Sequence, residues 1–184
     1  MDNIVLCKKS PELELFCREL GFSETLFLDE VELITENNPK LLCKKIEQAY
    51  HKKKVVIYKA TTEALLRLVL ERTAAEIVLG VEQINPEDSV HYVRGGLDQV
   101  LCKIAAEKGK IIAFSFAEIL QSKDRSKLIG RMRFNLRLCQ KYNVKPFFGN
   151  FSTDKMGLRS KKDLQAWERI LLKQKNKLVS SSRQ

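Results

Sequence analysis

Residues 55–80, VVIYKATTEALLRLVLERTAAEIVLG, decide the fold class. Two short and continuously apolar runs, 55–58 and 77–80, are typical of strands that are covered on both faces. Between them, residues 62–73 show the periodicity of a helix. A strand, a helix and a second strand in succession predict parallel strands joined by a right-handed crossover.

The same alternation of strands and helices continues on both sides of this stretch. Further strands are predicted at 3–7, 25–28, 111–116 and 146–151, and further helices at 10–20, 39–50 and 96–108. Ser10 and Pro11 are a good N-cap and first helical residue, and Gly21 is a good stop signal. An open doubly wound sheet and a closed barrel both fit. A barrel of eight β/α units usually needs about 200 residues or more, so a barrel here would be compact.

Length and composition predict one globular domain over residues 1–172 of the 184-residue chain. The last stretch, 173–184 (KQKNKLVSSSRQ), is polar and basic and is predicted to be disordered in isolation. No apolar run reaches the ~18 residues that a membrane helix needs. The first apolar stretch precedes a basic pair instead of following one, which argues against a signal peptide. We therefore expect a cytoplasmic protein without a membrane partner.

The five cysteines are widely spaced and odd in number, and no C-x-x-C pair occurs. This spacing argues against a zinc knuckle and against a thioredoxin motif. Most of them lie inside apolar periodic segments, where a free cysteine behaves as a small hydrophobic residue. We expect reduced thiols in the core.

The excess of positive over negative charge lies entirely in the last third of the chain. Residues 1–120 hold 16 basic and 19 acidic residues, whereas residues 121–184 hold 17 basic and 4 acidic ones. Such separation indicates a polyanionic partner, most often nucleic acid. A basic tail that only keeps the protein in solution is the simpler alternative.

Motifs for catalysis are scarce. The chain has two histidines, His51 and His91, too few for a dinuclear metal hydrolase, and it contains no HExxH, GxSxG or phosphate-loop motif. A magnesium site made of carboxylates alone would use Glu82 with Asp29 or Glu118, although ion pairing or capping explains these residues as well. Four polar residues follow predicted strands, on the edge where parallel folds place their sites, and each has a capping alternative: Lys59, Glu82, Ser115 and Ser152.

Residues 127–141 (KLIGRMRFNLRLCQK) predict an amphipathic helix without acidic residues. At 100° per residue, its apolar side chains gather around Met132. Five cations fall about 100° or more away from it: Lys127, Arg131, Arg133, Arg137 and Lys141. Such a face attracts phosphate with a strong salt dependence. A solubilising face is the alternative. Phe134 and Leu138 lie among the cations and are candidates for packing on a neighbouring helix, for a protein partner or for an unstacked base.

Two loops extend the basic surface. Residues 89–96 (SVHYVRGG) place His91, Tyr92 and Arg94 before two glycines that would expose backbone N–H groups to an anion, or that simply form a turn. Residues 158–164 (LRSKKDL) surround Ser160 with Arg159, Lys161 and Lys162. Ser160 and Asp163 also form a helix-start signal, so capping is the alternative there.

From residue 80 to 172 the chain resembles RNase P protein component 3, the archaeal relative of the thirty-kilodalton subunit of eukaryotic RNase P. The resemblance rests on 80–120, then on 131–144 (RMRFNLRLCQKYNV) and 158–164, in the family's order. The first 79 residues match the family mainly in their length and in the alternation of strands and helices. Residues 148–152 depart from the family pattern and Gly95 replaces a usual serine. The positions that match family motifs are His91, Tyr92, Arg94, Gly96, Ser115, Arg131, Arg133, Asn135, Arg137, Arg159 and Ser160.

The resemblance implies a compact TIM-like (β/α) barrel of about seven to eight strands, similar to the PHP hydrolases but without their metal site. It implies a protein subunit of ribonuclease P, which removes the 5′ leader of precursor tRNA. In that family the RNA carries out catalysis with magnesium, so no catalytic residue, metal ligand or protein-bound cofactor is expected. The implied partners are RNase P RNA, precursor tRNA, component 2 and other RNase P proteins.

Combined with the charge pattern, the resemblance gives two sets of candidate residues. Phe134 and Leu138 are expected to contact a protein partner. The expected RNA-binding residues are His91, Arg94, Lys127, Arg131, Arg133, Arg137, Lys141, Arg159 and Lys161. Two alternatives stay open, a small phosphoesterase on the same barrel and a general RNA-binding or protein-interaction module.

Overall fold

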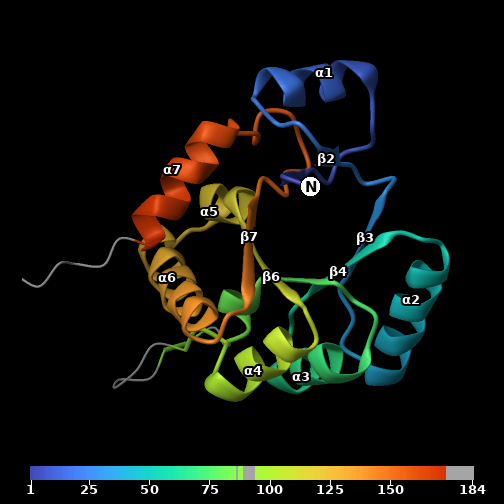
Figure 1. Cartoon of the computed structure of the whole chain (residues 1–184), viewed down its shortest axis with the longest axis vertical. Coiled ribbons are helices and arrows are strands. Elements are labelled where there is room, and N and C mark those ends of the chain that lie inside the picture. The colour runs from blue at the N-terminus through green and yellow to red at the C-terminus, as the bar shows by residue number, and fades with distance from the viewer. Residues whose placement is uncertain (86, 89–93, 173–184) are drawn as a thin grey trace, which may run out of the picture.

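The computed structural model describes residues 1–85, 87–88 and 94–172 (Figure 1). In chain order the elements are β1 (Asn3–Ile4), α1 (Pro11–Glu19), β2 (Thr25–Leu26), β3 (Val31–Ile34), α2 (Pro39–His51), β4 (Val55–Lys59), α3 (Glu63–Arg72), β5 (Ile77–Leu79), the 3₁₀ turn η1 (Val81–Gln83), α4 (Gln99–Glu107), β6 (Ile111–Ser115), α5 (Phe116–Gln121), α6 (Arg125–Lys141), β7 (Lys145–Gly149) and α7 (Lys161–Leu172).

The predicted class, α/β with parallel strands, is confirmed. Five parallel strands pair in the order β3-β4-β5-β6-β7, and β1 pairs with β2, also in parallel. Figure 1 shows the helices around the outside of the strands. Sequential order and parallel pairing follow from the strand–helix–strand units, because each helix returns the chain to the same end of the sheet.

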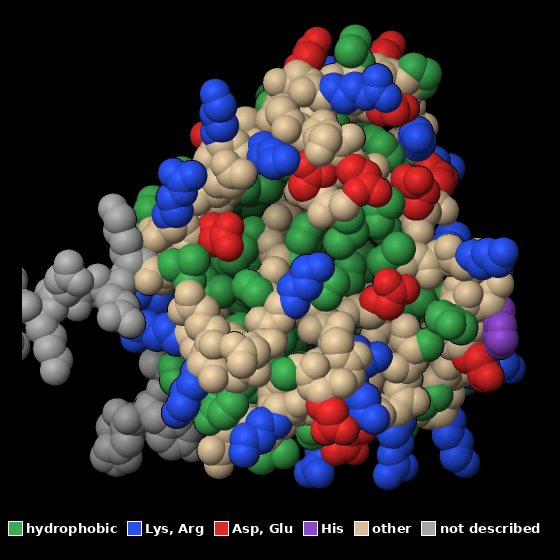
Figure 2. Space-filling model, viewed as in Figure 1, with side chains coloured by type: hydrophobic (Ala, Val, Ile, Leu, Met, Phe, Trp, Pro, Cys, Tyr) green, Lys and Arg blue, Asp and Glu red, His purple; other side chains and the backbone are tan. Residues whose placement is uncertain are grey.

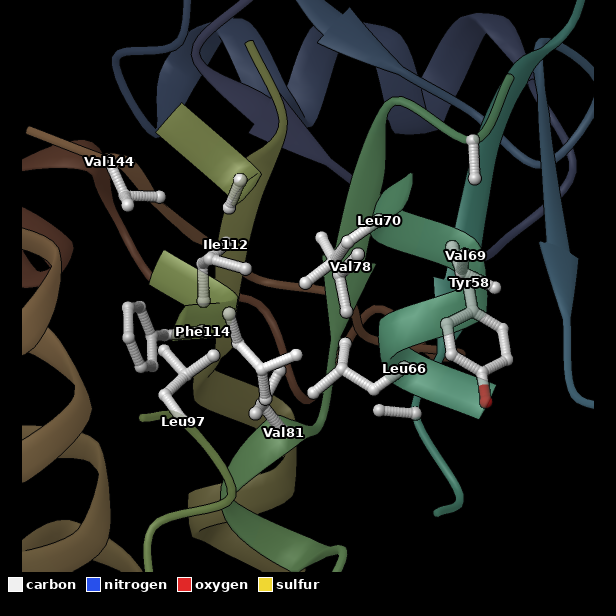
Figure 3. Close-up of a cluster of buried hydrophobic side chains, with 14 of the residues drawn as sticks. Tyr58, Leu66, Val69, Leu70, Val78, Val81, Leu97, Ile112, Phe114 and Val144 are labelled. Atoms are coloured by element: carbon white, nitrogen blue, oxygen red, sulfur yellow. The ribbon is translucent and has the colours of Figure 1, made fainter. Parts of the chain in front are cut away.

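Side chains of the central strands alternate between two cores. Tyr58, Val78 and Ile112 pack against the helices, in the cluster drawn in Figure 3. The neighbouring residues Ile57 and Ile77 point to the other face, into a second cluster that takes side chains from all seven strands. Both faces of the sheet are therefore buried, which explains the continuous apolar runs of the central strands, residues 55–58 and 77–79.

The hydrogen bonding differs from a single closed ring, because the described strands form two sheets. Only two residues pair in each strand of the smaller sheet. The sequence also missed two short elements, β3 and α5. The strand β3 follows β2 after a tight turn in which Val31 N–H bonds to the Phe27 carbonyl, so no helix separates them and the strand–helix rhythm gives no signal.

Two smaller predictions are confirmed. The Ser10 hydroxyl accepts a bond from Leu13 N–H at 3.2 Å, and Gly21 follows α1 with a φ of 89°. All five cysteines are free, and Cys17, Cys102 and Cys139 are buried. Burial raises the pKa of Cys139 to about 12, so this thiol is unreactive at neutral pH. The predicted tail, 173–184, lies outside the described residues. None of the described helices is long and apolar enough to cross a lipid bilayer.

Candidate functional site

The cations of α6 divide into two groups. Arg137 and Lys141 are exposed, and Lys127 and Arg133 are half-buried. Lys141 Nζ lies 5.4 Å from the centre of the Tyr142 ring. In Figure 2, Lys and Arg side chains lie over α6 and α7, and others lie along the opposite edge over the region of α2; acidic side chains are most frequent between α1 and β3. α6 therefore presents Arg137 and Lys141 to solvent, and its role as an RNA-binding surface stays a prediction.

Arg131 does not belong to this exposed surface, which corrects the five-cation face predicted from the helical wheel. Its side chain is 4% exposed. The guanidinium donates to Asp88 Oδ1 at 2.7 and 3.0 Å, to the Glu82 carbonyl at 3.1 Å and to the Asn85 carbonyl. The pair holds the pKa of Asp88 below its ordinary range. The wheel failed here because the chain after η1 covers this flank of α6, and a helical wheel contains no information on neighbouring segments.

Arg94, Phe134 and Leu138 line one groove of about 550 Å³ between α4 and α6. Phe134 is 36% exposed and Leu138 is half-buried. The structure thus brings both predicted partner-contact residues together with one predicted RNA-binding residue. His91 and Tyr92, predicted beside them, lie outside the described residues.

The two glycines that follow Arg94 have a packing role. Gly96 has a φ of 85°, and a Cβ there would lie 2.1 Å from the Val81 carbonyl oxygen. A Cβ on Gly95 would lie 2.4 Å from Asn135 Oδ1, and Asn135 donates to the Gly95 carbonyl at 2.6 Å. Only glycine permits this close approach. These contacts require glycine at both positions, and anion binding by this loop stays a prediction.

The second basic loop is held by its own contacts. Arg159 Nη1 donates to the Leu158 carbonyl at 2.8 Å and to the Met156 carbonyl at 3.1 Å, and its guanidinium lies 6.0 Å from the Phe116 ring centre. Lys161 pairs with Asp2 at 2.6 Å. Ser160 and Asp163 exchange the bonds of a capping box, so the capping alternative holds for Ser160. These residues join the start of α7 to the N-terminal segment.

Residues 148–152, where the sequence departs from the family pattern, anchor this loop. Asn150 is fully buried, and its amide donates to Asn3 Oδ1 and to the Arg159 carbonyl, both at 3.1 Å. Its Oδ1 accepts from Arg159 N–H at 2.8 Å. The Ser152 hydroxyl donates to the Asp154 carbonyl at 2.8 Å. These polar groups at the end of β7 therefore have structural partners.

The polar residues at the ends of β4, β5 and β6 meet in a pocket of about 360 Å³. Lys59 and Glu118 form an ion pair at 2.9 Å, and Gln83 Nε2 donates to Glu118 Oε2 at 2.6 Å. The Ser115 hydroxyl caps α5 by accepting from Glu118 N–H at 3.1 Å. Lys127, Leu128 and Arg131 complete the wall from the first turns of α6. The strand-end edge thus brings two buried charged residues, Glu82 and Arg131, and the Lys59–Glu118 ion pair around one cavity.

Glu82 is the unusual member of this pocket. It is fully buried, and neither carboxylate oxygen has a hydrogen-bond partner among the described residues. Burial, assisted by the charge of Glu118, raises the pKa of Glu82 to about 8. The carboxyl group is therefore mostly protonated at neutral pH.

The carboxylates that the sequence offered for magnesium do not all meet. Asp29 accepts from Lys9 N–H at 2.8 Å and is absent from the lining of the pocket that contains Glu82. Within residues 1–85, 87–88 and 94–172, no three His, Cys, Asp or Glu side chains come together as metal ligands would.

The resemblance to RNase P protein component 3 is confirmed by comparison with known proteins. Ribonuclease P protein component 3 of Methanococcus maripaludis strain C6 is 25% identical over 136 residues, and that of strain C5 is 24% identical over 139 residues. The strain C6 alignment covers 73% of this chain but 56% of the relative, so the chain spans little more than half the length of that protein. No protein-family model matches the chain.

Two solved structures share the fold. An amidohydrolase crystal structure is 13% identical with a TM-score of 0.52, covering 74% of this chain and 33% of its own. A chain of the cryo-EM structure of archaeal Ribonuclease P with mature tRNA is 17% identical with a TM-score of 0.71, and the match covers 94% of this chain and 74% of that one. This protein is thus similar in sequence to Ribonuclease P protein component 3 and similar in fold to a chain of archaeal Ribonuclease P.

Proposed function

We propose that this protein is a protein subunit of ribonuclease P, the ribonucleoprotein that removes the 5′ leader of precursor tRNA. The observation that carries the proposal is its similarity to Ribonuclease P protein component 3 over 73% of the chain. The exposed cations of α6, in a stretch without acidic residues, support it, because a subunit of a ribonucleoprotein must bind polyanionic RNA.

The protein's part in this function is binding, and the RNA carries out catalysis with magnesium. The polypeptide supplies no cofactor and no catalytic group in this proposal. Its partners are RNase P RNA, precursor tRNA within the complex, component 2 and the other RNase P proteins. We place the complex in the cytoplasm.

The proposed RNA surface is centred on Arg137 and Lys141, with Lys127 and Arg133 beside them. Arg94 extends it along the groove, and Arg159 and Lys161 extend it towards α7. Arg131 has a different role, because its guanidinium is used within the protein, where it holds the chain after η1 against α6. His91 is proposed from the sequence alone.

Phe134 and Leu138 are proposed to contact a protein partner, component 2. They lie in a groove of about 550 Å³, where the partly exposed Phe134 ring offers an apolar contact. In a pull-down with component 2, Phe134→Ala should weaken capture at least tenfold, whereas Val100→Ala, at another exposed apolar position, should not. Equal capture by both variants would remove Phe134 from the interface.

We also propose that the two sheets close into a compact, TIM-like barrel. Phe151 N–H donates to the Ile4 carbonyl and Leu6 N–H to the Ser152 carbonyl, both at 2.8 Å, so backbone bonds join the end of β7 to the region of β1. The shared inner cluster supports the same arrangement. An experimental structure in which β2 and β3 lie far from this cluster would contradict it.

The function is tested by reconstitution with RNase P RNA, the other protein subunits and precursor tRNA at limiting magnesium. Arg137→Ala and Lys141→Ala should each lower the affinity for the RNA and reduce the slope of log affinity against log salt by roughly one unit or less. Lys40→Ala and Lys44→Ala, at exposed positions of α2, are the matched controls. Processing that does not depend on adding this protein would overturn the proposal.

A further inference from the structure

The five-stranded sheet has an edge strand, β3, which stands at the end of the strand order and pairs with β4. The ladder between them starts where Val55 N–H donates to the Glu30 carbonyl. Bonding residues alternate along a parallel ladder, so Glu32 and Ile34 bond to β4. The N–H and the carbonyl of Leu33, which lies between them, therefore point away from β4.

The contacts that join the two sheets leave this edge uncovered. The turn from β2 to β3 engages Val31, and β1 bonds to the chain that follows β7. Within the described part of the chain, no side chain and no backbone group outside the sheet bonds to the backbone of Leu33 or to the N–H of Thr35. Leu33 is half-buried and Thr35 is exposed, so a further strand can reach these backbone groups.

A groove of about 260 Å³ lies beside the open edge. Residues 32–35 form one wall and α2, which lies beside β3 in Figure 1, forms the other. The buried side chains of Ile34 and Ala49 give the groove an apolar part. A strand edge next to such a groove is a recurrent binding site for an extended peptide, whose backbone pairs with the strand while alternate side chains enter the groove.

The chemistry of this edge identifies its occupant. Leu33 offers a donor and an acceptor, and Thr35 offers a further donor, at the spacing of a β-ladder. Another extended backbone supplies complementary groups at that spacing, which side chains and nucleotides do not. We propose that the β3 edge and the groove bind an extended segment of a protein partner, which adds to the sheet as a further strand.

The side chains around the edge restrict the sequence of that segment. Successive side chains of a strand point to opposite faces. One set would lie beside Leu33, which packs against the inner apolar cluster, so apolar residues fit there. The other set would enter the groove, beside Ile34 and the side chains of α2.

Charge in the groove favours an acidic partner. Lys45 pairs with Glu36 at 2.7 Å, and Lys54 pairs with Glu32 at 3.0 Å. Lys52 is an exposed residue of the α2 wall and has no ion pair among the described residues. An acidic side chain in the groove would therefore meet an unmatched positive charge. The expected segment alternates apolar residues with small and acidic ones.

A second copy of this chain fits the edge less well. Residues 39–54 hold six lysines and one acidic residue. Pairing of two β3 edges would bring two such segments together, and their charges would repel. The inference goes beyond the proposed function and does not depend on it, because this groove shares no lining residue with the groove that contains Phe134.

Amide hydrogen exchange of the full chain, followed by NMR, tests the edge directly. In the free protein the Leu33 and Thr35 amides should exchange about tenfold or more faster than the Ile34 amide, which bonds to β4. The probe is the synthetic peptide acetyl-TVEVTVEVT-amide, which alternates valine with threonine and glutamate. Its addition at millimolar concentration should protect the Leu33 and Thr35 amides and leave the Ile34 amide unchanged.

Modified peptides separate backbone recognition from side-chain recognition. The N–H groups of alternate residues point to the same edge of a strand. Methylation of the backbone nitrogens of all valines, or of all the other residues, therefore blocks one edge of the peptide and leaves the other intact. One of these two peptides should fail to bind and the other should bind. The charge-reversed peptide acetyl-TVKVTVKVT-amide should bind about tenfold more weakly or worse.

Variants of the protein place the peptide in the groove. Lys52→Glu should reverse the preference, so that the lysine peptide binds better than the glutamate peptide. Lys44→Glu, at an exposed position of α2 outside the groove, is the matched control and should keep the original preference. Thr35→Pro removes an outward N–H and should weaken binding of the glutamate peptide about tenfold. The methylated peptides need no variant, so they decide the matter even if Thr35→Pro folds poorly.

Other occupants of the edge would give different results. An oligouridine that shifts the amides of residues 32–35 and displaces the peptide would assign the groove to RNA. Protection of the Leu33 amide that rises with protein concentration in the absence of peptide would assign the edge to a second copy. Either of these results overturns the proposal. Equal binding of the two methylated peptides, or no change at residues 32–35 with excess peptide, overturns it as well.

Discussion

Two groups of charged residues lie on or beside α6, and their surroundings are opposite. Arg131 and Glu82 are buried at the ends of the strands, where they are in contact with protein. Arg137 and Lys141 are exposed on the outer side of the same helix. Burying the inner group, Arg131 and Glu82, costs folding free energy unless the protein supplies partners. The outer group, Arg137 and Lys141, stays hydrated at little cost and is available to a polyanion.

The comparison teaches that a cation's type and helical phase do not decide its role. Arg131 and Arg133 are both about 100° from the apolar centre of α6 on an ideal wheel. Arg131 is buried because the Glu82 and Asn85 carbonyls and the Asp88 carboxylate surround its guanidinium. The functional assignment of a basic helix therefore depends on the segments packed on its flanks.

Among the inner residues, Glu82 should have the largest effect on the free energy of unfolding, through its dependence on pH. Its folded-state pKa of about 8 lies above its ordinary value of 4.5, so the folded chain retains a proton that the unfolded chain loses. The free energy of unfolding should therefore fall as pH rises from 4.5 to 8, by at most about 5 kcal/mol from this group. Urea titrations at pH 5 and pH 8 measure it. Glu82→Gln should remove this part of the pH dependence; identical pH profiles for both proteins would show that Glu82 ionises normally.

Arg131→Ala should lower the free energy of unfolding by about 3 kcal/mol, because it leaves Asp88 and two carbonyls without their donor. Arg137→Ala, on the exposed side of the helix, should change it by less than about 0.5 kcal/mol. Chemical denaturation of the two variants compares the inner and outer cations directly. Equal stability of both variants would break the distinction between them.

Gly96→Ala tests the segment that lies against the inner side of α6. The new Cβ would meet the Val81 carbonyl at a residue whose φ is already 85°, so we expect a loss of about 2 kcal/mol or more. Gly109→Ala is the matched control, because Gly109 also has a positive φ, 63°, but open space around it. It should cost about 1 kcal/mol. Thermal unfolding of both variants separates crowding from backbone strain, and a similar loss in both would mean that the close approach is unimportant.

The smallest change in the free energy of unfolding is expected from a substitution on the exposed side of α6. Gly130 lies in the middle of α6, is exposed, and a Cβ there would touch nothing within 4 Å. Gly130→Ala should therefore stabilise the protein by up to about 1 kcal/mol, through helix propensity alone. RNA affinity should stay unchanged in a filter-binding assay. A loss of affinity with a gain in stability would show that RNA approaches the helix at this residue.

Much of the fold was predictable because its signals are local. Continuous apolar runs gave the central strands, and the strand–helix alternation gave their parallel order. Ser10, Pro11 and Gly21 marked the bounds of α1. The strand β3 was missed because a turn, and not a helix, precedes it.

The candidate site was predictable only in part. The sequence by itself determined the basic composition of α6, because a run of cations without acidic residues is visible in any conformation. Only the tertiary structure decided that Arg131 pairs with Asp88, 43 positions away, and that Asn150 holds the loop of Arg159. It also decided that Lys59, Glu82 and Glu118 meet around one pocket. Parallel strands bring their ends together across long stretches of chain, and no local pattern records which side chains then become neighbours.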